Sequence, residues 1–202
     1  MRLPNFIKTI FSKLIVREIH SSELDITRCV IQSYHYKNKI LPAAFEPPKS
    51  DTAVSLVRLK YTNENIAKRD GIKLASSKPQ GSEFKGLVVI NNRMLNEINN
   101  SNIGLSAYIA GTPLDENGNY ISTNLNVYKC DRGKPYHADI IYSEPKPAGG
   151  EPATKFREYS NSLVKMVQSK NLFVEDRCPN LSSWCSELIS SVVLKNFNKN
   201  RS

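Results

Sequence analysis

The chain has 202 residues, of which 40% are hydrophobic and 23% are charged. These values are typical of a single globular domain and exclude an intrinsically disordered chain. The formal net charge of +9 excludes an acidic protein, and it makes nucleic acid, an anionic surface or an acidic protein the partner classes to consider. The four cysteines are irregularly spaced and no secretory signal precedes them, which predicts reduced thiols and a cytoplasmic location. No apolar stretch approaches the length of a membrane span.

The N-terminal segment, residues 1–20, is predicted to be an amphipathic helix, followed by one domain over 21–202. Apolar residues recur four positions apart along it, and they make Phe6, Ile10, Phe11 and Leu14 candidate partner-binding residues. Such a helix either packs on its own domain or docks on a partner or an anionic membrane face.

The rest of the chain alternates predicted strands and helices. Strands are expected at 26–36, 53–61, 84–90, 104–110, 120–128 and 137–142, where β-forming residues cluster or alternate. Helices are expected at 63–76, 154–170 and 181–197, from residues at helical spacing, and a short helix or turn is expected at 94–100. The order predicts an α+β fold: a mainly antiparallel or mixed sheet with helices packed on it, and amphipathic helices at both termini.

Familiar cofactor and metal motifs do not occur in the sequence. No glycine-rich turn joins a strand to a helix, so neither a P-loop nor a dinucleotide fingerprint is present. The segment Asp115–Asn119 superficially resembles a calcium loop, but its glycine is misplaced, and a hairpin turn is predicted instead. Cys178 and Cys185 lack the close spacing of a structural zinc site. We therefore predict neither a cofactor nor a metal.

His137 and Asp139 form the most suggestive pair of side chains. Residues two apart on a strand share a face, so the imidazole and the carboxylate are expected to lie side by side. A carboxylate beside an imidazole can prepare it as a general base or as a ligand-binding group. The alternative is a hydrogen-bonded polar pair with a purely structural role.

Arg58 is unusual because it lies within a strongly apolar predicted strand. A buried arginine needs an anion, and Asp139 is the expected partner in a structural ion pair if the two strands are neighbours. Alternatively, Arg58 binds a phosphate or carboxylate of a ligand, for which its planar fork is suited.

His35 and Cys29 are weaker candidates for chemistry. His35 could form an acid–base pair with His137 for phosphodiester cleavage, provided that the fold brings the two together. Cys29 lies in an apolar setting that would raise the pKa of its thiol, so core packing is the favoured interpretation.

Three short segments occur in a fixed order: Ala44-Phe45-Glu46-Pro47, Val54-Ser55-Leu56-Val57-Arg58 and His137-Ala138-Asp139-Ile140. With them the chain resembles a scattered group of short, uncharacterised bacterial proteins, over roughly residues 40–142. The resemblance implies a bacterial or mobile-element source and groups Arg58, His137 and Asp139 as a shared centre. It implies no activity.

Three functions are compatible with these features, and they leave open whether the protein is an enzyme. The first is an accessory or adaptor protein that binds a larger protein partner in a bacterial operon-encoded system, such as one used in defence. The second is an enzyme or a binder of a phosphorylated ligand, centred on His137, Asp139 and Arg58. The third is nucleic-acid binding through basic residues such as Lys129, Arg132, Lys134 and Arg157.

Overall fold

The computed structural model describes residues 26–78, 82–101, 103–121, 133–148 and 153–177. The predicted helices at 1–20 and 181–197, and most of the predicted strand at 120–128, lie outside these residues. The strands of the main sheet are β1 (Ile26–Ile31), β4 (Ala53–Arg58), β5 (Phe84–Ile90), β6 (Ala107–Gly111), β7 (His137–Tyr142) and β8 (Phe173–Glu175). The helices are α2 (Glu64–Ser76), α3 (Asn92–Asn99) and α4 (Thr154–Ser169), and a small hairpin is formed by β2 (His35–Tyr36) and β3 (Lys39–Ile40).

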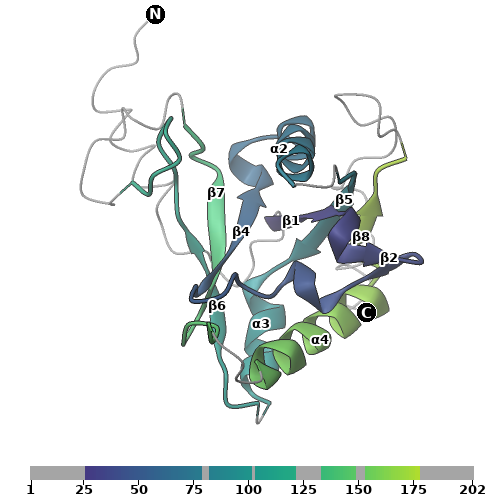
Figure 1. Ribbon diagram of the computed structural model, residues 1–202, viewed down its shortest axis with the longest axis vertical. Coiled ribbons are helices and arrows are strands. Elements are labelled where there is room, and N and C mark those ends of the chain that lie inside the picture. The colour runs from purple at the N-terminus through teal and green to yellow at the C-terminus, as the bar shows by residue number, and fades with distance from the viewer. Residues whose placement is uncertain (1–25, 79–81, 102, 122–132, 149–152, 178–202) are drawn as a thin grey trace, which may run out of the picture.

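The main sheet has six strands in the order β6-β7-β4-β1-β5-β8, and each neighbouring pair is antiparallel. Together with the three helices, this confirms the predicted α+β class. The antiparallel alternative within that prediction is the one observed in the described residues. Figure 1 shows α2 at the top of the view and α3 and α4 at the bottom, with the central strands between them.

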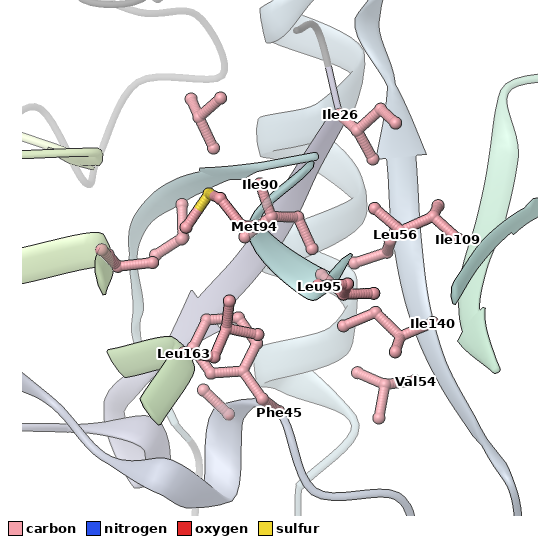
Figure 2. Close-up of a cluster of buried hydrophobic side chains, with 14 of the residues drawn as sticks. Ile26, Phe45, Val54, Leu56, Ile90, Met94, Leu95, Ile109, Ile140 and Leu163 are labelled. Atoms are coloured by element: carbon pink, nitrogen blue, oxygen red, sulfur yellow. The ribbon is translucent and has the colours of Figure 1, made fainter. Parts of the chain in front are cut away.

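Alternation of side chains gives the sheet two faces. The core face carries residues such as Leu56 and Ile140, which belong to the same buried cluster as Met94 and Leu95 of α3 and Leu163 of α4 (Figure 2). Burial of these apolar side chains is the main force that holds the two helices on the sheet.

The opposite face, here called the α2 face, packs against α2 over β1 and β5. Cys29 of β1 marks the contact, because its Sγ donates to the carbonyl of Ala67 on α2 at 3.6 Å. Toward β7 and β6, the α2 face is bordered instead by residues 112–120, whose Thr112 and Tyr120 contact Asp139 of β7. The candidate site lies there.

Helix α2 begins where the Asn63 side chain accepts a hydrogen bond from the backbone N–H of Ile66, as an N-cap does. Gly71 in its middle has a packing role, since a Cβ at this position would lie 2.3 Å from the Phe84 ring of β5. Glycine is a poor helix former, but at this position it permits the close approach of helix and sheet. Within the described residues, no helix has the length and apolar character needed to cross a bilayer.

The outer edge of β6 is covered by two asparagine side chains of α3. Asn99 donates to the carbonyl of Ala107 at 2.8 Å and accepts from its N–H at 2.9 Å. Asn92 makes the same two contacts with Ile109, at 3.4 and 2.7 Å. These amides stand in for a neighbouring strand, so the edge does not offer these groups to another chain.

Candidate functional site

Strand β7 presents His137 and Asp139 on the α2 face, as the two-residue spacing predicts. His137 pairs with Val57 and Asp139 with Ser55 across β4. Asp139 is fully buried and His137 retains 8% of its exposure. A fully buried carboxylate is unusual, because removal of the charge from water is costly unless partners compensate.

Thr112 connects these two side chains. It follows the end of β6, where its backbone N–H donates to the carbonyl of His137 at 3.1 Å. Its hydroxyl Oγ1 donates to Asp139 Oδ2 at 2.6 Å and lies 3.0 Å from His137 Nδ1. The direct distance from Nδ1 to Oδ2 is 3.7 Å, so the hydroxyl is the closer link between the two groups.

The surroundings of His137 determine which ring nitrogen carries the proton. Nδ1 lies 2.8 Å from the carbonyl oxygen of Thr112. A carbonyl only accepts hydrogen bonds, so Nδ1 must be the donor and must carry a hydrogen. In the neutral ring, Nε2 then has a free lone pair, and it makes no hydrogen bond with any described residue. Nε2 is thus a proton acceptor or a ligand for an incoming group.

Burial lowers the pKa of His137 from its ordinary value of 6.5. The nearby Asp139 and the hydrogen bond to the Thr112 carbonyl act in the opposite direction, but burial outweighs them. The imidazole is therefore neutral at pH 7, and the Nε2 lone pair is available.

Tyr120 completes the cluster. Its hydroxyl donates to Asp139 Oδ2 at 3.2 Å, and its ring lies 6.4 Å from that of His137, centroid to centroid. The ring is mostly exposed, but burial of the hydroxyl end, together with the adjacent Asp139 carboxylate, raises the pKa of Tyr120 to about 12. Tyr120 therefore stays protonated and acts as a donor. We refer to Thr112, Tyr120, His137 and Asp139 as the His137 cluster.

A second polar group joins the start of β7 to α2. The Tyr136 hydroxyl donates to Asp70 Oδ2 at 3.0 Å, and Lys134 Nζ lies 3.0 Å from the same oxygen. Burial and the adjacent Asp70 raise the pKa of Tyr136. Asp70 therefore offsets the charge of Lys134 beside the His137 cluster.

Arg58 does not pair with Asp139, contrary to the predicted ion pair. Their strands, β4 and β7, are neighbours, and Val57 of β4 pairs with His137. Arg58 is the next residue along β4, and it lies opposite Ile26 of β1. Alternation then directs Arg58 away from the α2 face. Its guanidinium lies 4.5 Å from the centre of the Tyr61 ring. The expected centre of Arg58, His137 and Asp139 is therefore not assembled.

His35 is also remote from His137. Its ring packs against Phe173 of β8, at 5.4 Å between centroids. Strands β8 and β7 are four steps apart in the sheet, which corresponds to roughly 19 Å. The two histidines therefore do not form the expected acid–base pair.

Cys29 is buried, and burial raises the pKa of its thiol to about 11, so it is an inert core residue.

In the turn that begins at Asp115, the carboxylate oxygen Oδ1 of Asp115 accepts hydrogen bonds from the backbone N–H groups of Asn117 and Asn119, each at 2.9 Å. The carboxylate is therefore engaged in the hairpin turn. Within the described part of the chain, His, Cys, Asp and Glu do not gather into a group of three that could hold a metal ion.

Several predicted interaction residues cannot be placed. The candidates Phe6, Ile10, Phe11 and Leu14 lie outside the described residues. Lys129 and Arg132, two of the four basic residues proposed to bind nucleic acid, also lie outside them. Of the other two, Lys134 pairs with Asp70 and Arg157 lies exposed on α4.

Thr112 and Tyr120 were not singled out from the sequence. Neither belongs to a motif. The pairing of β6 with β7 brings Thr112 to Asp139, and the bridge between Leu114 and Tyr120 brings Tyr120 back to it. The useful signal would have been the position of Thr112 in the Gly-Thr-Pro turn that follows the predicted strand at 104–110.

No protein-family model matches the chain, and comparisons with curated proteins and with solved structures give no match either.

Proposed function

We propose that this protein binds a small polar ligand at the His137 cluster and that His137 Nε2 accepts a hydrogen bond or a proton from it. The observation that carries the proposal is the contact between His137 Nδ1 and the Thr112 carbonyl at 2.8 Å, which leaves Nε2 as the free nitrogen. A neutral imidazole with one anchored nitrogen and one free nitrogen is the arrangement used for general bases and for ligand-binding histidines.

Proton uptake at Nε2 would be supported by the rest of the cluster. The resulting imidazolium would hold its Nδ1 hydrogen on the Thr112 carbonyl and hydroxyl, and that hydroxyl already donates to Asp139. The carboxylate charge thus lies one hydroxyl away from the new positive charge. If the ligand carries a hydroxyl group or orders a water molecule, the same arrangement would activate it as a nucleophile.

The test is a ligand screen read as a change in melting temperature, with wild type, His137→Gln and His35→Gln. His35 is the matched control, because it packs on β8 and not in the cluster. We expect stabilising compounds to lose their effect in His137→Gln and keep it in His35→Gln. Compounds that act equally on all three proteins would remove His137 from the binding site.

We also propose, as a second function, that the protein is a cytoplasmic accessory subunit that docks on a larger protein through residues 1–17. The apolar stripe of Phe6, Ile10, Phe11 and Leu14 is the observation that favours it. A tagged protein that lacks residues 2–17 should lose a stoichiometric protein partner that full-length protein retains. Equal recovery of the partner by both proteins would contradict this role.

A further inference from the structure

The polar groups of the His137 cluster are unequally satisfied. Both hydroxyl donors, from Thr112 and Tyr120, already serve Asp139 Oδ2. The other carboxylate oxygen, Oδ1, is occluded and has no hydrogen-bond partner in the described part of the chain. His137 Nε2 also has no donor from any described residue. A ligand that completes this site must therefore supply hydrogen-bond donors, because the unsatisfied atoms are acceptors.

The charge of the site favours the same kind of ligand. Among the described residues, Asp139 makes no ion pair with a lysine or an arginine, and its nearest titratable base is the neutral His137. Lys134 is held by Asp70. A buried carboxylate that has no cationic partner among the described residues attracts a cation and repels phosphate. The phosphorylated ligand expected from Arg58 does not fit this environment.

The neighbours of Asp139 leave it flanked by small side chains. Ser55 on β4 and Ala110 on β6 are its cross-strand partners. Tyr108 lies two residues before Ala110 on the same face and is 56% exposed, and Tyr120 is 64% exposed. Exposed aromatic faces beside a carboxylate are the surroundings in which organic cations are held by cation–π attraction. Tyr120 is bonded to Oδ2 and reaches solvent, so a donor that approaches the occluded Oδ1 is expected to displace it.

We propose that the ligand of the His137 cluster is a small organic cation with N–H donors, an alkylguanidinium or alkylammonium. Asp139 supplies the countercharge, His137 Nε2 accepts one N–H, and the rings of Tyr108 and Tyr120 cover the alkyl and cationic parts. This inference is based on the proposed function above, and it names the chemical class of the ligand for the same site.

The test is an NMR titration of the full chain with ethylguanidinium, with inorganic phosphate and glucose as competing classes. We expect saturable shifts at His137 and Tyr120 with ethylguanidinium only. Replacement Asp139→Asn should weaken binding by about tenfold or more, and Tyr108→Leu by about threefold to tenfold. Tyr36→Leu is the matched control, because Tyr36 is 60% exposed on the β2–β3 hairpin and should not alter binding.

A second arm distinguishes the source of the cation. An acetylated and amidated Gly-Arg-Gly peptide carries the same guanidinium as a side chain. Tighter binding of the free ethylguanidinium supports a small-molecule ligand, and tighter binding of the peptide assigns the site to a protein partner and overturns the small-molecule proposal.

The outcomes also separate this inference from the proposed function. Shifts at His137 with phosphate or glucose, but not with ethylguanidinium, would overturn the ligand class and leave the site intact. A titration in which Tyr108→Leu and Tyr36→Leu bind ethylguanidinium equally well would likewise overturn it. If no compound in the ligand screen depends on His137, the proposed function fails as well.

Discussion

Thr112 controls the geometry of the His137 cluster, because its hydroxyl and carbonyl both contact His137 Nδ1 while the hydroxyl also donates to Asp139. The residue has no charge and belongs to no motif. Its importance comes from position, one residue after β6 and beside the first residue of β7.

We expect Thr112→Val to destabilise the protein, because the substitution keeps the shape of the side chain and removes the donor to a fully buried carboxylate. The expected loss is about 1–3 kcal/mol in the free energy of unfolding. Chemical denaturation measures it, and Thr112→Ser, which keeps the hydroxyl, is the control. Equal stability of the valine and serine variants would show that the bond to Asp139 contributes little.

Arg58 illustrates what the sequence could not reveal at the residue scale. Its apolar context correctly predicts burial, and Arg58 is 1% exposed. The choice of Asp139 as its partner required the strand register, and a shift of one residue reverses the face on which a side chain lies. His137 and Asp139 are two apart on the same strand, so their shared face follows from spacing alone.

At the scale of elements, the edge of β6 shows how two side chains replace a strand. Asn92 and Asn99 are seven residues apart on α3, which places them on the same side of the helix. Asn99 also accepts a hydrogen bond from the Tyr159 hydroxyl at 2.9 Å, so it links the edge strand to α4.

The variant Asn99→Ala is expected to leave the N–H and carbonyl of Ala107 without partners. The free energy of unfolding should fall by about 1–3 kcal/mol, and the exposed edge should favour self-association. Denaturation and light scattering measure the two effects. Asn96→Ala, on an exposed position of α3, is the matched control, and equal behaviour of the two variants would show that the asparagine contacts do not protect the edge.

Element positions were predicted well where the sequence pattern is strong. The strands Phe84–Ile90 and His137–Tyr142 have the predicted bounds, since each is a sustained run of β-forming residues. Strand β8 was missed, because three residues between a helix and a polar segment carry no periodicity. The predicted strand at 53–61 ends at Arg58 and continues as a short 3-10 helix, Leu59–Tyr61.

On the scale of the whole molecule, the buried His137 links stability to pH. Burial lowers its pKa in the folded state below the ordinary value of 6.5. Between the two pKa values, the unfolded chain binds more protons than the folded one, so stability rises with pH and is lost on acidification. Asp139 and Asp70 reduce this effect, and Lys134 increases it.

We therefore expect wild type to lose more stability between pH 7 and pH 5 than His137→Gln does, because glutamine does not titrate. Urea denaturation at the two pH values measures this difference. An identical loss in both proteins would mean that protonation of His137 does not oppose folding.

The ligand-binding role requires that His137 is neutral at pH 7, with its hydrogen on Nδ1 and a lone pair on Nε2. The most direct measurement is the ¹⁵N NMR spectrum of the imidazole nitrogens in the full chain, assigned by comparison with His137→Gln. Our account predicts a protonated Nδ1 and an unprotonated Nε2 for this residue at pH 7. A ring protonated at Nε2 alone, or at both nitrogens, would contradict the proposed ligand-binding role.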